Sequence, residues 1–159
     1  MNKTALRDAI LLHLRRELAQ QVSAAHLARD EAISEESRPE NKYDTHSQEA
    51  AYLAEGQARL AAEIEESIAH YTSLPLPAFS SDATIALGAL VEIGAAGRSA
   101  WYLLGPRAGG IELQLDGRNI LVLTPQSPLG RQLLGKRVGD EVLAPGRGKP
   151  VAQTIRAVA

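Results

Sequence analysis

The segment SPLGRQLLGK, residues 127–136, predicts one short helix with both of its ends defined. Ser127 is a good N-cap, because its hydroxyl oxygen can accept a hydrogen bond from a backbone N–H of the first turn. Pro128 then occupies the first helical position, where a missing N–H costs nothing. Gly135 can end the helix in the left-handed conformation. Leucines at helical spacing give the helix an apolar face, namely Leu129, Leu133 and Leu134.

Short apolar runs on both sides of this helix predict β-strands. They are TIALGALVEI, SAWYLLG, GIELQL and NILVLT before the helix, and DEVLA and VAQTIRAV after it. Turns that contain Gly or Pro separate them, and the first run places apolar residues at every second position, as a strand does. Residues 84–159 are therefore expected to form a small antiparallel β-sheet packed by one short helix, which is an α+β domain.

The chain changes composition near residue 72. Residues 1–72 contain a single glycine and a single proline and are rich in Ala, Leu, Glu, Gln and Arg, which favour helix. The segment SLPLPAFSSDA, residues 73–83, indicates a linker, because each proline disfavours helix in the residue before it. Acidic residues outnumber basic ones before the linker, and the reverse holds after it. We expect a helical domain over 1–72, a linker over 73–83 and a sheet domain over 84–159.

Two narrow apolar stripes at helical spacing run through the first 72 residues. One comprises Leu11, Leu14, Leu18, Val22, Ala25 and Ala32, and the other comprises Leu53, Leu60, Ile64, Ile68 and Tyr71. Neither helix can bury its stripe alone, and a short polar turn separates the two. They are therefore expected to pack antiparallel as a helical hairpin. On periodicity alone, an arm that mediates dimerisation fits equally well.

The expected turn of the hairpin, DEAISEESRPENKYD at residues 30–44, is rich in carboxylates. Ser37 and Glu40 have the spacing of a capping box, in which a serine caps a helix and a glutamate three residues later bonds back to it. One interpretation is thus a capped turn with solvated charges. The other is an incomplete site for a hard cation, whose carboxylate ligands are completed by a partner that the tip reaches.

The composition excludes several classes of site. The absence of cysteine excludes disulfides, thiolate zinc sites and cysteine nucleophiles, and the four histidines include no i, i+4 pair. No run of about 18 apolar residues and no secretory signal is found, so we expect no membrane contact and a cytoplasmic location. An aromatic content of 4% and a net charge of −2 argue against a surface that grips nucleic acid by stacking or by bulk charge.

Residues 127–142, SPLGRQLLGKRVGDEV, resemble the signature of the C-terminal domain of the Gre transcript-cleavage factors, GreA and GreB. Glu40 and Asn41, followed by a run that ends in Glu55 and Gly56, are similar to the acidic tip and second helix of that family's coiled coil. The resemblance covers nearly the whole chain and is most specific at 127–142. It implies an FKBP-like C-terminal domain behind an antiparallel coiled-coil hairpin.

Gre factors bind bacterial RNA polymerase through the globular domain and insert the coiled coil into the secondary channel. The resemblance implies the same docking here, through Gln126, Ser127, Pro128 and Arg131. It also implies that tip residues help to hold a Mg²⁺ of the polymerase active centre during cleavage of backtracked RNA, namely Glu40, Glu36, Glu35, Asn41 and Ser37, with Glu40 and Glu36 as metal ligands. The chain would then be a monomeric accessory factor, neither an enzyme nor a holder of its own cofactor, and would contact nascent RNA only indirectly.

Ser37 departs from the family's tip, which usually has the pattern Asp-x-x-Glu-Asn. A hydroxyl coordinates Mg²⁺ more weakly than a carboxylate, so Glu36 or Glu35 would have to substitute. Two alternatives stay open. One is a regulator that occupies the channel without stimulating RNA cleavage, since the related Rnk proteins bind polymerase but are not cleavage factors. The other is a coiled-coil dimerisation protein. A prolyl isomerase is disfavoured, because its pocket needs an aromatic cluster and residues 73–159 hold only Phe79, Trp101 and Tyr102.

Overall fold

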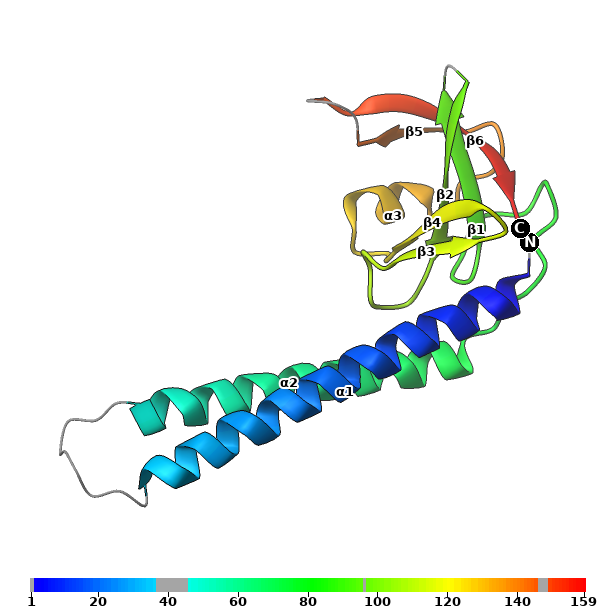
Figure 1. Cartoon of the computed structure of the whole chain (residues 1–159). Coiled ribbons are helices and arrows are strands. Elements are labelled where there is room, and N and C mark those ends of the chain that lie inside the picture. Colours follow the sequence, from blue (N-terminus) through cyan, green and yellow to red (C-terminus); the bar gives the residue numbers. More distant parts are fainter. Residues whose placement is uncertain (1, 37–45, 96, 146–148) are drawn as a thin grey trace. The chain divides into compact units, whose positions relative to one another are not determined.

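The chain begins with two long helices, α1 over Lys3–Glu36 and α2 over His46–Ser73 (Figure 1). The computed structural model describes residues 2–36, 46–95, 97–145 and 149–159. The chain forms two compact units, one of Leu12–Ala69 and one of Met1–Leu11 together with His70–Ala159. The first turns of α1 and the last turn of α2 thus belong to the unit that contains the sheet.

Alanines, rather than the predicted large residues, fill much of the seam between α1 and α2. The buried residues of the Leu12–Ala69 unit are Leu14, Ala28, Ala32, Ala50, Ala61 and Ser67. Val22, Leu53 and Leu60 were expected inside but are 38%, 55% and 43% exposed. Successive helical residues are about 100° apart, so Leu60 points well away from the seam that Ala61 occupies. The hairpin is confirmed. The predicted stripes are wrong at Leu53 and Leu60, whereas Val22 is partly exposed because it lines a groove between the two helices.

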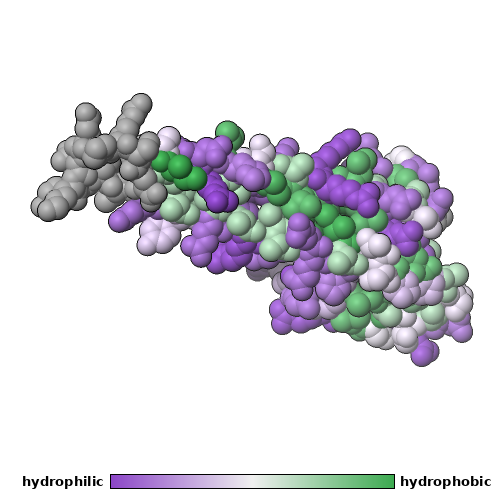
Figure 2. Space-filling model, turned by 90° about the horizontal axis from the view of Figure 1, so that it is seen from below, coloured by the Kyte–Doolittle hydropathy of each residue, from purple (hydrophilic) through white to green (hydrophobic). Residues whose placement is uncertain are grey.

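A groove of about 340 Å³ lies between the two helices. Both helices contribute to its lining, which comprises Val22, Ala25, His26, Arg29, Ala54, Ala58, Ala61, Ala62 and Glu65. The alanine floor accounts for the groove, because methyl side chains leave open the space that leucines would fill. On the face drawn in Figure 2, hydrophobic residues lie among hydrophilic ones along the helices.

Six strands form one sheet in the order β3-β4-β2-β1-β6-β5. Their bounds are Leu90–Ala95 for β1, Arg98–Leu104 for β2, Glu112–Leu115 for β3, Arg118–Leu123 for β4, Glu141–Ala144 for β5 and Val151–Val158 for β6. One short helix, α3 over Pro128–Leu133, follows β4. Neighbouring strands are antiparallel except β2 and β4, which run parallel with Trp101 opposite Ile120. The predicted α+β fold is confirmed, with a mixed rather than a wholly antiparallel sheet.

The parallel pair follows from the two connections around β3. Residues 105–111 carry the chain from the end of β2 to the edge of the sheet, where β3 begins. Asp116 and Gly117, with φ of 52° and 72°, then form a two-residue hairpin turn. The connection over residues 105–111 reverses the chain, so β3 runs opposite to β2, and β4, which returns antiparallel to β3, runs parallel to β2.

Different elements cover the two faces of the sheet. Against one face, α3 packs into a buried cluster that comprises Ile85, Ala89, Val91, Ile93, Leu104, Leu123, Leu129, Leu133, Val142, Ala144, Ile155 and Val158. On the other face, Tyr71 of α2 lies so close to Gly105 that an added Cβ there would fall 2.0 Å from the phenolic oxygen. The Tyr71 hydroxyl donates a hydrogen bond of 2.9 Å to the carbonyl oxygen of Arg107. Burial raises the pKa of Tyr71 above its usual range.

Lys3 ties the start of α1 to the segment that precedes β1. Its ammonium donates to the carbonyl oxygens of Pro77 and Gly88, the latter at 3.4 Å, and lies 4.8 Å from the centre of the Phe79 ring. These contacts hold part of the predicted linker, residues 73–83, against the N-terminal turn of a helix. The division of the chain into domains at residues 72 and 83 stays a prediction.

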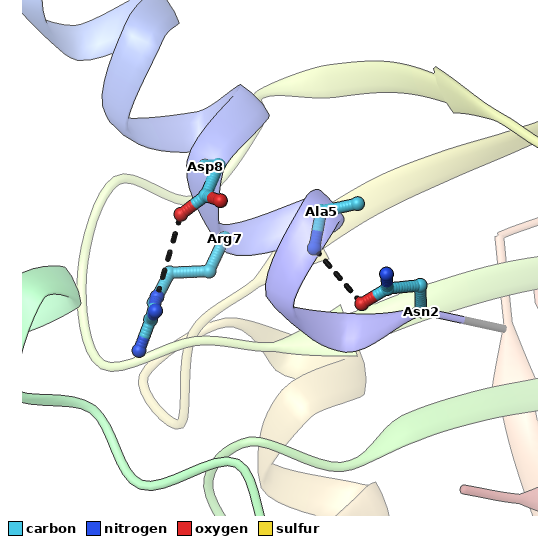
Figure 3. A network of polar contacts seen from close by, with 4 residues as sticks. All are labelled: Asn2, Ala5, Arg7 and Asp8. Atoms are coloured by element: carbon cyan, nitrogen blue, oxygen red, sulfur yellow. Dashed lines mark hydrogen bonds and ion pairs between the residues drawn. The ribbon is translucent and has the colours of Figure 1, made fainter.

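The N-terminus of α1 is capped by a side chain (Figure 3). The Oδ1 atom of Asn2 accepts a hydrogen bond of 3.1 Å from the backbone N–H of Ala5, which is the N-cap interaction. Nearby, the Nε atom of Arg7 lies 3.8 Å from a carboxylate oxygen of Asp8. The helix start is therefore fixed locally as well as by Lys3.

Candidate docking site beside helix α3

Helix α3 begins as the sequence predicts. Ser127 is extended, with φ of −69° and ψ of 151°, and its Oγ accepts a hydrogen bond of 3.1 Å from the N–H of Gly130. The same hydroxyl donates to the carbonyl oxygen of Thr124 at 2.8 Å, so the cap also fixes the preceding turn. Pro128 occupies the first helical position, and Gly135 follows the helix with a φ of 75°. The predicted cap and terminator are both confirmed.

Gly130 lets the turn before α3 close tightly on the helix. A Cβ at this position would lie 2.0 Å from the carbonyl oxygen of Thr124 and 2.7 Å from the Oγ of Ser127. Both distances are far below the roughly 3.5 Å at which non-bonded heavy atoms come into contact. The turn and the first turn of the helix are therefore in close contact, and any side chain at position 130 would force the backbone of the turn to shift.

The structure brings the four predicted docking residues together on one turn. Gln126 and Pro128 are exposed, Ser127 is half-buried, and the exposed Arg131 follows one helical turn later. The Nη2 atom of Arg131 donates to the carbonyl oxygen of Gln126 at 3.0 Å, which holds the guanidinium beside the turn. A cation thus lies next to an exposed proline, and binding of a partner by these residues stays a prediction.

An apolar groove of about 680 Å³ opens at this turn. Its lining comprises Ser127, Pro128, Leu129 and Gln132 from the helix region, Tyr102, Leu121 and Leu123 from β2 and β4, and Leu143, Pro145, Lys149 and Pro150 from β5 and the residues after it. Ligand sites typically have volumes of roughly 300–1,000 Å³. Lys149 is the charged residue among the described lining residues, and burial raises the pKa of the Tyr102 phenol.

Sequence reasoning missed most of this groove. Tyr102 and Leu121 are far apart in sequence, and they become neighbours because β2 pairs with β4. The alternation in β5 did contain a signal: Val142 and Ala144 are buried, so Leu143 between them points to the opposite side and is 54% exposed. To place Leu143 beside α3, however, the strand order has to be known.

Gln132 joins α3 to the edge strand β5 through its side-chain amide. Its Nε2 donates to the carbonyl oxygen of Leu143 at 3.2 Å and to that of Pro128 at 3.3 Å. Its Oε1 accepts a hydrogen bond of 2.8 Å from the N–H of Leu143. One side chain therefore bonds to the backbone of two other residues that line the groove.

The predicted catalytic and metal-binding residues lie at or beyond the end of α1. Glu35 and Glu36 are its last two residues, whereas Ser37, Glu40 and Asn41 fall outside the described residues. A Mg²⁺-assisting role for them stays a prediction. In the part of the chain that the structure describes, no group of three or more His, Asp or Glu residues is placed to hold a metal ion. No described helix is both long enough and apolar enough to cross a membrane.

Comparison with known proteins found similarity only among solved structures, since no family model and no curated protein matches the chain. GreA factor homolog 1 (Gfh1) of Thermus thermophilus is 20% identical, with a TM-score of 0.39 over 94% of each chain. A structure described as the transcription factor Gfh1 is also 20% identical, with a TM-score of 0.41 over 93% of this chain and 92% of that one. Gfh1 of Thermus aquaticus is 21% identical, with a TM-score of 0.39 over 92% and 91%.

Proposed function

We propose that the chain is a transcription elongation factor that binds bacterial RNA polymerase and places its hairpin in the secondary channel. One observation carries the proposal: the segment at residues 127–142, which resembles the Gre signature, builds a capped turn at the mouth of an apolar groove. A partner can bury apolar side chains in such a groove while polar groups at its rim fix the orientation. In this role the chain is a cytoplasmic accessory factor of the polymerase and not an enzyme.

The turn that leads into α3, residues 124–128, is called the docking turn below, and its order supports binding. Ser127 is held by two hydrogen bonds, and Arg131 is held by its bond to the carbonyl of Gln126. Because these groups are already fixed, little conformational entropy is lost when a partner binds. Arg131 and Lys149 add positive charge beside the groove, which favours an acidic surface on the partner.

Two activities are compatible with this docking, and they differ in what the hairpin tip does. The carboxylates of residues 30–44 support assistance to a polymerase-bound Mg²⁺, because hard cations prefer oxygen ligands. Ser37, in place of the family's aspartate, supports a regulator that occupies the channel without stimulating cleavage. Cleavage of backtracked RNA is the activity we propose first.

Docking is tested by co-sedimentation of the full chain with RNA polymerase. Pro128→Glu places a bulky anion on the exposed turn and should reduce binding at least tenfold, an order-of-magnitude loss typical of an interface contact. Ser81→Glu introduces the same side chain at an exposed position outside the lining of the groove and should bind normally. Equal binding by wild type and Pro128→Glu would place the interface elsewhere. A wild type that sediments as a stable dimer without polymerase would favour the dimerisation alternative.

The role of the tip is tested on backtracked polymerase complexes by release of 3′ RNA fragments. Glu40→Gln should abolish stimulated cleavage but leave binding intact, because the amide keeps the size of the side chain and loses its charge. A residue that only caps a helix would tolerate this change, since Gln serves a capping box nearly as well as Glu. Ser37→Asp should increase cleavage at low Mg²⁺. If neither the wild type nor Ser37→Asp releases fragments, the chain is a non-cleaving regulator.

A further inference from the structure

The edge strand β5 pairs with backbone on one side and with a side chain on the other. β5 is the last strand of the sheet, and β6 is its neighbour. On the free side, Oε1 of Gln132 accepts the N–H of Leu143 at 2.8 Å, and Nε2 donates to the C=O of the same residue at 3.2 Å. An opposing residue makes the same two bonds in an antiparallel ladder. At Leu143, Gln132 therefore takes the place of an adjacent strand.

The same amide reaches the docking turn. A third hydrogen bond, of 3.3 Å, runs from Nε2 of Gln132 to the carbonyl oxygen of Pro128. Both amide N–H groups are thereby used, one toward Pro128 and one toward Leu143. Pro128 and Leu143 are 15 positions apart in the printed sequence, yet both line the groove. Gln132 is thus a bridge between the residue expected to dock and one wall of the groove.

We propose that Gln132 is the positioning residue of the docking groove: it fixes the turn at Pro128 relative to β5 and closes the β5 edge to strand pairing. The part of this proposal that concerns docking rests on the proposed function. Because the backbone of Leu143 is already hydrogen-bonded, a partner is recognised by side chains buried in the groove and not by adding a strand. Loss of the amide removes all three of these hydrogen bonds, two to Leu143 and one to Pro128.

The primary test measures hydrogen exchange at the Leu143 amide by NMR in the full chain. Leu143 is exposed and lies on an edge strand, so its protection depends on Gln132. Gln132→Met keeps the length of the side chain and replaces the amide by a thioether, which has no donor and is only a weak acceptor. It should speed exchange at Leu143 about tenfold, the factor expected for one hydrogen bond. Polymerase affinity should fall by a similar factor. Gln114→Met makes the same change on the opposite edge strand, β3, where the structure gives the side chain no hydrogen bond, and should alter neither quantity.

Gln132→Glu separates the two roles of the amide. Its carboxylate can still accept a hydrogen bond from the N–H of Leu143. It cannot donate to the carbonyl oxygens of Leu143 and Pro128, and its negative charge repels them. Protection of Leu143 should therefore stay close to that of the wild type, while polymerase affinity falls as in Gln132→Met. This variant also provides a result if Gln132→Met does not fold.

The outcomes distinguish this proposal from the proposed function. A Leu143 amide that exchanges equally fast in the wild type and in Gln132→Met overturns the bridge itself. Faster exchange in Gln132→Met, together with unchanged polymerase affinity in both Gln132 variants, overturns the positioning role of Gln132. A wild type that does not bind polymerase overturns the proposed function and the docking part of the proposal, while the exchange measurement still decides whether Gln132 closes the β5 edge.

Discussion

Two helical glycines should respond in opposite ways to alanine. In α2, a Cβ added to Gly56 would meet nothing within 4 Å. Glycine in a helix interior costs about 0.5–1 kcal/mol relative to alanine, so Gly56→Ala should raise the free energy of unfolding of the hairpin by about that amount. Gly130 lies in α3, so alanine at this position also has the higher helix propensity. The structure, however, leaves no room there for the methyl group of alanine.

The cost at Gly130 follows from the distances around it. The new Cβ would fall 2.0 Å from the carbonyl oxygen of Thr124, which is backbone and cannot rotate away. Overpacking of this kind costs about 1–3 kcal/mol, and displacement of the Ser127 cap adds about 1 kcal/mol. The helix preference of alanine returns about 1 kcal/mol. Gly130→Ala should therefore destabilise the sheet unit by about 1–3 kcal/mol.

Urea unfolding followed by two probes separates the two effects. Trp101, the single tryptophan, lies in β2 and reports on the sheet unit by fluorescence, whereas far-ultraviolet circular dichroism reports mainly on the long helices. Gly130→Ala should lower the fluorescence midpoint at unchanged slope, and Gly56→Ala should raise the dichroism midpoint. A fluorescence midpoint for Gly130→Ala at or above that of the wild type would refute the tight closure of the docking turn.

Other substitutions test the anchors of the sheet unit. Tyr71→Phe removes the hydrogen bond to the carbonyl of Arg107 and should lower the free energy of unfolding by about 1 kcal/mol in urea titration at pH 7. Burial raises the pKa of Tyr71, and an unfolded tyrosine titrates near pH 10. Wild-type stability should therefore fall as pH rises above about 10, and more steeply than that of Tyr71→Phe; parallel curves would contradict the burial of the phenol. Lys3→Met should speed hydrogen exchange in residues 74–79, and Lys3→Arg should do so less, whereas unchanged exchange in both would argue against the Lys3 contacts. Ser127→Asp still accepts the N–H of Gly130 and should be about 1 kcal/mol more stable than Ser127→Ala; equal urea midpoints would argue against the cap.

Local signals in the sequence predicted helix α3 well. Ser127, Pro128 and Gly135 act within one or two turns of the backbone, so their effect does not depend on the rest of the fold. The structure places them at the start and end of α3 as expected. The strands after β1 were recognised for the same reason, since apolar runs bounded by Gly- or Pro-containing turns are a local signal. The alternating run TIALGALVEI, however, forms a strand only from Leu90 onward.

Features that depend on long-range pairing were not predictable. The parallel β2–β4 pair arises because β3 moves to the sheet edge, which no local pattern specifies. The groove needs that pairing as well as the position of β5 beside α3. In the hairpin, the helical spacing of apolar residues was recognisable in the sequence. The prediction placed large residues such as Leu53 in the contact between the helices, whereas alanines such as Ala50 are the residues buried there. The helices instead approach through alanine, whose small side chain permits close contact.

In the proposed function, one chain docks on RNA polymerase through the docking turn and reaches into the secondary channel with its hairpin. Photo-crosslinkers at Gln126, on the docking turn, and at Gln48, exposed near the start of α2, test both parts in one complex. We expect Gln126 to crosslink to the rim of the channel and Gln48 to crosslink to polymerase residues that line it, with both products lost in Pro128→Glu. Crosslinks from Gln48 only to a second copy of the chain, or none to polymerase from either position, would contradict the proposed function.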